Sequence, residues 1–226
     1  MKKQKKQKSK FATTFDLRHL PMDLGRLVCL PCPLLFRVKR VRPDGTRYRG
    51  RLRGGHLLVS NHVGFADPFW MGSCFWYRRI FFLTAEHIME RKLQGLLLRG
   101  MGCIRIDRNI SDLEAVRRAI DTVKEGHCLT VFAQGGIDRS GDLTAIKSGA
   151  ILMGLRSGAP LVPMYTRRRK HWYERQVVVI GEAFRCSDFC TRKMPSMGDI
   201  EQLSSILLSR MEECKNTYDA MKGPIK

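Results

Sequence analysis

The segment HLLVSNHVGFADPFW, from His56 to Trp70, joins a short apolar run to a polar turn and the start of a helix. The run 56–60 is typical of a buried strand. Asp67 followed by Pro68 is typical of a helix start, with Asp67 as the N-cap and Pro68 in the first turn. Because His62 stands five positions before Asp67 in the same turn, the two are either a catalytic pair or the polar residues of a strand-to-helix connection.

Short apolar strands alternate with helical patterns along the rest of the chain. We predict strands at 79–84, 103–107, 128–133, 160–166 and 176–181, and helices at 86–100, 111–126 and 144–158 and along a terminal segment. This alternation predicts an α/β fold, a single domain with a largely parallel central sheet flanked by helices. In such sheets ligands bind beyond the carboxyl ends of the strands. The side chains predicted there are those of His62, Arg108, Gln134 and Pro163.

The composition divides the chain into three expected segments: a basic tail and lead-in at 1–25, a short membrane-facing segment and basic hairpin at 26–53, and the main domain at 54–226. Within the hairpin, arginines alternate with other residues, so that on an extended strand they would point to a single face. These arginines are Arg47, Arg49, Arg51 and Arg53. The run RRRKH at 167–171 is interpreted as a solvated loop that also attracts lipid phosphates.

The sequence is strongly basic. It contains 41 Lys and Arg against 21 Asp and Glu, a formal net charge of +20, which predicts a polyanionic partner, either nucleic acid or an anionic membrane surface. No helix-turn-helix, zinc-finger or RNA-recognition signature is found, so we expect an anionic membrane surface and no nucleic acid. No apolar stretch reaches the ~20 residues of a transmembrane helix, which favours peripheral binding.

The eight cysteines are expected to be reduced thiols. No signal peptide is evident, and a reducing cytoplasm disfavours disulfides. The CxxC pair of Cys29 and Cys32 is interpreted as packing, so we expect no metal site.

The residue types of the turn suit one kind of chemistry. Acyl transfer to a hydroxyl requires removal of the hydroxyl proton as the oxygen attacks the carbonyl, and a neutral imidazole, with an ordinary pKa of ~6.5, is well matched to that task. A carboxylate on the other ring nitrogen fixes the tautomer and stabilises the imidazolium as it forms. His62 and Asp67 could take these two roles.

Four blocks follow one another in order: NHVGFAD (61–67), GCIRIDR (102–108), FAQGGIDR (132–139) and PLVPMY (160–165). Their order and spacing resemble the glycerolipid acyltransferase family, the 1-acylglycerol-3-phosphate acyltransferases and their relatives. That family has an NHxxxxD box, a glycine-to-arginine box, an FPEGTRS-like box and a short strand containing VP. The resemblance covers roughly half of the chain.

The resemblance implies an acyltransferase that moves a fatty acyl group from acyl-CoA or acyl-ACP to the free hydroxyl of a lysophospholipid, here 1-acyl-glycerol-3-phosphate, at the cytoplasmic face of the membrane. It implies no cofactor beyond this thioester co-substrate. His62 would be the general base and Asp67 its orienting partner. The residues implied to contact the acceptor or to shape its pocket are Arg108, Gln134, Gly135, Arg139 and Pro163.

The third block departs from the family pattern. Gln134 stands in place of the usual glutamate and Ile137 in place of an arginine, while Arg139 fits a further arginine that many members carry. The loss of a carboxylate and a cation suggests an altered acceptor. We therefore keep as alternatives an acyltransferase for a different acceptor lipid, an inactive lipid-binding relative and, more distantly, a basic nucleic-acid-binding protein.

Overall fold

The structure is a computed structural model that describes residues 20–29, 38–90, 92–107, 112–140, 142–143, 146–169, 171, 174–190, 192 and 194–222. Within these residues one sheet contains β1 (Lys39–Val41), β2 (His56–Ser60), β3 (Ile80–Ala85), β4 (Cys103–Ile106), β5 (Cys128–Phe132), β6 (Leu161–Thr166) and β7 (Val177–Ile180). The helices are α1 (Leu20–Cys29), α3 (Asp67–Cys74), α4 (Glu86–Met89), α5 (Lys92–Gly100), α6 (Leu113–Lys124), α7 (Gly149–Ser157) and α8 (Met197–Lys222), with a 3-10 helix, η2, at Cys186–Asp188.

The strand order of the sheet is β1-β7-β6-β2-β5-β3-β4. Neighbouring strands are parallel except β6 and β7, which pair antiparallel, so β1 and β7 run against the other five. In the centre, Leu57 of β2 lies beside Leu161 of β6 and Leu129 of β5. This arrangement confirms the predicted α/β fold, and it places the carboxyl ends of β6, β2 and β5 side by side.

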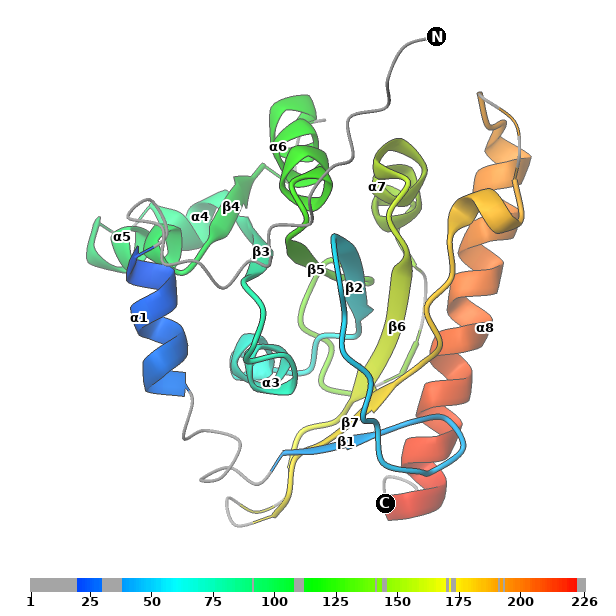
Figure 1. The fold of residues 1–226 in the computed structure, drawn as a ribbon, viewed down its shortest axis with the longest axis horizontal. Coiled ribbons are helices and arrows are strands. Elements are labelled where there is room, and N and C mark those ends of the chain that lie inside the picture. Colours follow the sequence, from blue (N-terminus) through cyan, green and yellow to red (C-terminus); the bar gives the residue numbers. More distant parts are fainter. Residues whose placement is uncertain are drawn as a thin grey trace, which may run out of the picture.

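Helices cover both faces of the sheet (Figure 1). The helices α6, α7 and α8 pack on one face and α3 on the other, with α1 beside α3. Successive residues of β2 pack on opposite faces of the sheet. Leu57 and Val59 belong to the buried cluster under α6 to α8, whereas Leu58 belongs to the cluster under α3. All of β2 is buried, which explains why the run 56–60 is apolar and does not alternate with polar residues.

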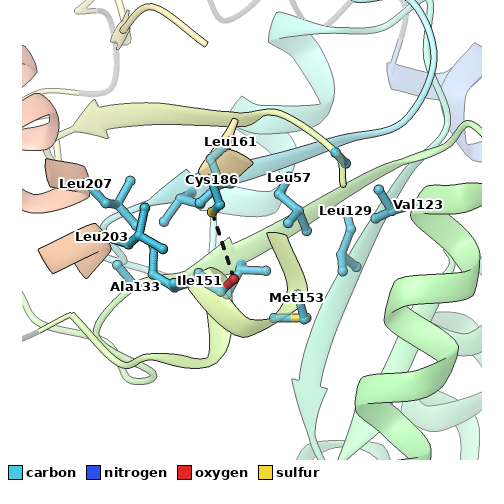
Figure 2. Close-up of a cluster of buried hydrophobic side chains, with 14 of the residues drawn as sticks. Leu57, Val123, Leu129, Ala133, Ile151, Met153, Leu161, Cys186, Leu203 and Leu207 are labelled. Carbon is cyan, nitrogen blue, oxygen red and sulfur yellow. Dashed lines mark hydrogen bonds between the residues drawn. The ribbon is translucent and has the colours of Figure 1, made fainter. Parts of the chain in front are cut away.

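The larger buried cluster joins the sheet to the C-terminal helix (Figure 2). Leu203 and Leu207 of α8 lie with Ile151 of α7 and Leu161 of β6. The thiol of Cys186 lies 4.0 Å from the Ile151 carbonyl oxygen and packs as a small apolar side chain. Along α8 the buried residues are Leu203, Leu207, Met211, Cys214 and Tyr218, whose helical spacing places them on one side of the helix.

The predicted helix at 86–100 is in fact two helices, α4 and α5. The backbone of α5 approaches α4 so closely that a Cβ at Gly95 would lie 2.1 Å from the Met89 carbonyl oxygen. Because this contact needs a change of chain direction between the two helices, the periodic pattern could not continue as one helix.

The predicted helix at 144–158 begins only at Gly149. Just before it, the Lys147 N–H donates to the Ala133 carbonyl oxygen, at 3.0 Å, immediately beyond β5. This tertiary hydrogen bond holds the backbone of Lys147 beside the end of β5 and outside the helix.

The basic hairpin turns immediately after β1. Arg47, Arg49, Arg51 and Arg53 are all exposed. Between them, Tyr48 and Leu52 pack into the cluster under α3. The alternation therefore separates solvent-facing cations from buried side chains, although β1 itself is only three residues long.

A buried ion pair attaches α1 to the sheet. Arg79, next to β3, donates to Asp23 of α1 from Nε at 2.9 Å and from Nη2 at 2.6 Å, and both side chains are buried. The helix crosses the boundary expected between the segments 1–25 and 26–53. Most of the predicted tail and membrane-facing segment, 1–19 and 30–37, lies outside the described residues.

Candidate active site

Three connections meet at the carboxyl edge of the sheet: the turn 61–67 after β2, the loop 133–140 after β5 and the segment 167–169 after β6. A backbone hydrogen bond joins the first two, because the Asp138 N–H donates to the His62 carbonyl oxygen at 2.7 Å. Because β2, β5 and β6 are parallel neighbours, the connections that follow them lie at the same edge of the sheet. The structure therefore gathers the first and third sequence blocks around His62.

The turn after β2 is organised by the carboxylate of Asp67. The Nδ1 atom of His62 lies 2.6 Å from Asp67 Oδ2, and the same oxygen accepts the backbone N–H groups of Val63 at 2.7 Å and Gly64 at 2.9 Å. Asp67 is the first residue of α3, and Ala66 occupies the N-cap position without a side-chain cap. The predicted N-cap role of Asp67 is therefore wrong, since its carboxylate turns back toward His62 instead.

The ring of His62 is fixed on two sides. Phe132, the last residue of β5, stacks on it with ring centres 4.0 Å apart and planes 13° apart, while Asp67 holds Nδ1. Because an ionised carboxylate only accepts hydrogen bonds, Nδ1 of the neutral ring carries the hydrogen and Nε2 keeps a free lone pair. This arrangement can remove a proton from a hydroxyl placed at Nε2.

The third block folds on itself. The Gln134 amide donates to the Asp142 carbonyl oxygen at 2.7 Å and to Asp138 Oδ2 at 3.3 Å. Gly135 has a φ of +71°, a conformation that favours glycine. A Cβ there would also lie 3.0 Å from Nζ of Lys147, whose side chain would have to move. The backbone of Gly135 is thus approached closely by the Lys147 side chain, and its predicted contact with the acceptor stays a prediction.

The remaining predicted site residues are dispersed. Arg139 is exposed and lines a cavity beside Asp67. Pro163 is buried inside β6, where its carbonyl accepts the Gly181 N–H at 2.8 Å, and it is not among the residues that line that cavity. Arg108 lies outside the described residues, so its predicted role stays a prediction.

The cavity has a volume of about 430 Å³. It is lined by the turn 63–67, by Trp70 of α3, by Arg139, and by side chains that follow or face the end of β6, namely Arg168, Arg169, His171 and Gln176. The ring of His62 is not part of this lining. The cavity therefore borders the Asp67 side of the histidine–aspartate pair.

The basic run at 167–171 is partly structural, which corrects its interpretation as a solvated loop. Arg167 is buried, and its Nη1 lies 2.8 Å from Oδ1 of Asp219 on α8. Its Nε also donates to the Tyr165 hydroxyl at 2.8 Å. Arg167 therefore anchors the segment after β6 to the terminal helix, whereas Arg168 is exposed.

Asn61 is a site residue that sequence reasoning missed. Its Nδ2 donates to the Thr166 carbonyl oxygen at 2.8 Å, and its Oδ1 accepts the Thr166 N–H at 3.0 Å. Both residues are fully buried. The position of Asn61 directly after a buried strand was a signal for such a role, but its partner lies 105 residues further along the chain.

The buried cysteines are poor candidates for nucleophiles. Burial raises the pKa of Cys74 to about 12 and that of Cys128 to about 11, so both remain thiols near neutral pH. In the described ranges no three His, Cys, Asp or Glu side chains are grouped so that they could hold a metal ion. None of the described helices has the length and apolar character needed to cross a membrane.

Comparison with known proteins gives consistent matches. A family model described as Acyltransferase matches residues 40–167. The 1-acyl-sn-glycerol-3-phosphate acyltransferase of Borreliella burgdorferi is 25% identical over 125 residues, covering 54% of this chain and 49% of that protein. The chloroplastic 1-acyl-sn-glycerol-3-phosphate acyltransferase BAT2 of Brassica napus is 26% identical over 110 residues, covering 48% of this chain and 31% of that protein.

A solved structure extends the match to most of the chain. The crystal structure of the 1-acyl-sn-glycerophosphate (LPA) acyltransferase PlsC from Thermotoga maritima superposes with a TM-score of 0.59 at 13% identity, covering 95% of this chain and 86% of that chain. At this identity the match concerns the fold. The chain spans about half the length of the bacterial curated relative and about a third of the plant one.

Proposed function

The chain belongs to the acyltransferase family, and from this premise we propose that it transfers a fatty acyl group from an acyl thioester to the free hydroxyl of a lysophospholipid. The proposed acceptor is 1-acyl-glycerol-3-phosphate, and the proposed donor is acyl-CoA or acyl-ACP. The names of the two curated relatives support this acceptor. No cofactor beyond the thioester is part of the proposal.

The observation that carries the proposal is the hydrogen bond between His62 and Asp67. Nδ1 and Oδ2 are 2.6 Å apart, and the stacked ring of Phe132 holds the imidazole plane. A neutral histidine fixed in this tautomer has the proton-accepting nitrogen that attack by a hydroxyl requires.

In the proposed reaction, Nε2 of His62 takes the proton of the acceptor hydroxyl as its oxygen bonds to the thioester carbonyl carbon. Asp67 stabilises the imidazolium that results. The tetrahedral intermediate then expels the thiolate by cleavage of the carbon–sulfur bond, and the imidazolium returns the proton to sulfur. The products are an ester and a free thiol, and His62 ends neutral, ready for another cycle.

We also propose that the protein works as a peripheral enzyme at the cytoplasmic face of the membrane. The net charge of +20 supports attraction to anionic lipid, to which each well-placed cation near the surface contributes about 1 kcal/mol. Phe65 and Phe69, beside the catalytic turn, are 78% and 47% exposed and are suited to the headgroup region. In vesicle sedimentation, equal binding to neutral and anionic lipid would contradict the electrostatic part of this proposal.

The activity is tested with purified protein, both donor types and a panel of lysophospholipid acceptors, with the product identified by lipid mass spectrometry. We expect His62→Ala to lower acyl transfer by about 100-fold or more. His127→Ala, which changes a histidine at the opposite edge of the sheet next to β5, is the matched control and should retain activity. An active His62→Ala protein would exclude the general-base role, and a folded but inactive wild type would favour a lipid-binding relative.

A further inference from the structure

The cavity beside Asp67 is strongly basic. Arg139, Arg168 and Arg169 all line it, and Asp67 is the carboxylate among the lining residues. That carboxylate is already occupied, because His62 and two backbone N–H groups bond to its Oδ2. The cavity therefore presents an excess of positive charge to any ligand that enters it.

The arginines that line the cavity differ in how they are held. The guanidinium of Arg169 lies 4.7 Å from the centre of the Trp70 ring and donates to the Glu174 carbonyl oxygen at 3.1 Å. In the part of the chain that the structure describes, neither Arg139 nor Arg168 forms an ion pair with a carboxylate. Two guanidinium groups at the cavity are thus available to a ligand.

The wall that carries Arg168 is rigidly attached to the catalytic turn. Asn61 pairs with both backbone groups of Thr166, and Gln176 donates to Thr166 Oγ1 at 2.5 Å and to the Arg167 carbonyl oxygen at 2.8 Å. These buried amides fix the backbone of the two residues that precede Arg168. The point from which the Arg168 side chain extends is therefore set before a ligand arrives.

We propose that this cavity is a binding site for a phosphate ester, with Arg168 and Arg139 as its principal cations. A guanidinium can donate two parallel hydrogen bonds to phosphate oxygens, which makes arginine the suitable side chain. The choice of phosphate as the ligand rests on the proposed function, in which the acceptor headgroup and the donor coenzyme both carry phosphate esters. The same chemistry serves either source.

Gln176 adds a second feature of the site. Because its amide nitrogen donates to two oxygens, the orientation of the group is fixed, and its buried Oε1 has no hydrogen-bond partner within the described residues. Gln176 is 1% exposed and lines the cavity. Because this oxygen is itself buried, it can accept a hydrogen bond only from a ligand hydroxyl placed directly against Gln176. The ribose phosphate of coenzyme A combines a phosphate with a hydroxyl that the reaction does not use, whereas the single free hydroxyl of the proposed acceptor is the one that donates to His62.

The first experiment measures binding without turnover. Calorimetry with glycerol 3-phosphate and with coenzyme A would compare wild type, Arg168→Gln and Arg156→Gln. Arg156, exposed in the last turn of α7, loses the same charge in the control. Glycerol and pantetheine serve as phosphate-free probes. We expect Arg168→Gln to weaken binding of at least one phosphate probe by about tenfold or more, and the control to stay close to wild type.

The outcomes separate the alternatives. An effect on glycerol 3-phosphate, with a raised acceptor KM, would assign the site to the acceptor, and an effect on coenzyme A, with a raised donor KM, would assign it to the donor. Equal weakening by Arg156→Gln, unchanged binding in Arg168→Gln, or no phosphate binding by wild type would overturn the proposal. A change confined to binding of anionic vesicles would likewise overturn it and place Arg168 at the membrane surface.

The result does not depend on the catalytic proposal. The same titrations on His62→Ala protein test the phosphate site in a variant that should not turn over. If wild type binds phosphate through Arg168 yet transfers no acyl group, the proposed function fails and the binding site stands.

Discussion

Asp67→Asn removes the charge of the carboxylate and almost nothing else. The amide has nearly the same size, and its oxygen can still accept the N–H groups of Val63 and Gly64, which now lie 2.7 and 2.9 Å from Asp67 Oδ2. The turn should therefore keep its shape. What is lost is the attraction between the carboxylate and the imidazolium that forms on His62 during the reaction.

The size of this loss follows from the contact between His62 and Asp67. Their nearest atoms are 2.6 Å apart, which places the centres of charge about 4 Å apart, where opposite charges attract by about 4 kcal/mol at an effective dielectric constant of about 20. If half to all of the imidazolium charge is present in the transition state, about 2 to 4 kcal/mol is lost, or roughly 30- to 1000-fold in kcat.

The assay is the initial rate of thiol release from acyl-CoA at saturating lysophospholipid, with KM measured in parallel. We expect the loss to appear in kcat, because Asp67 acts through the imidazolium that forms on His62, and we expect no rise in KM, because the change removes a negative charge from the basic cavity. Asp121→Asn, an exposed aspartate of α6, is the control for charge, and thermal unfolding checks the fold. A kcat within about fivefold of wild type, in a folded protein, would refute the role of Asp67 as the orienting and stabilising group.

Asp23→Ala should lower the free energy of unfolding by about 3 to 5 kcal/mol, because the buried Arg79 would lose the carboxylate that pairs with it; a urea titration that finds a loss below about 1 kcal/mol would contradict this. Gln134→Glu would set a second carboxylate beside Asp138, where an amide now donates at 3.3 Å, so we expect a lower Tm that high salt partly restores. Burial raises the pKa of Cys74 from an ordinary 9.0 to about 12. Its stabilising contribution is therefore complete below pH 9 and is lost as the pH rises from 9 towards 12, a dependence that unfolding at several alkaline pH values should detect and that Cys74→Ala should reduce.

The fold was largely predictable because its determinants are local. Most strands of the sheet are short apolar runs, and alternate residues fill the two clusters on either side, as Leu57 and Leu58 illustrate. The exception is β1, whose three residues include two cations and which was not predicted. The terminal helix has a single buried face with a helical period. The boundaries that failed depend on tertiary contacts that no periodic pattern encodes, such as the hydrogen bond from the Lys147 N–H to the Ala133 carbonyl oxygen.

The site was predictable where residues lie close in sequence. The pairing of His62 with Asp67 was predicted from their spacing together with the order of the four blocks, although the same turn also suggested that Asp67 caps a helix. The link between Asn61 and Thr166 joins residues 105 positions apart, and nothing local indicates it. The burial of Arg167 and the exposure of Arg168 could also not be predicted, because they depend on the position of α8 and not on residue type.

In the segment after β6, different arginines hold the backbone in place and face the cavity. Arg167 and Arg169 hold the backbone through buried or stacked contacts, whereas the side chain of Arg168 makes no such contact within the described residues. Random replacement at position 168 should thus leave the scaffold intact while altering what enters the cavity. A single substitution at position 168 could therefore change the preferred ligand during evolution. A mutant library varied at this position would test other ligand preferences without loss of stability.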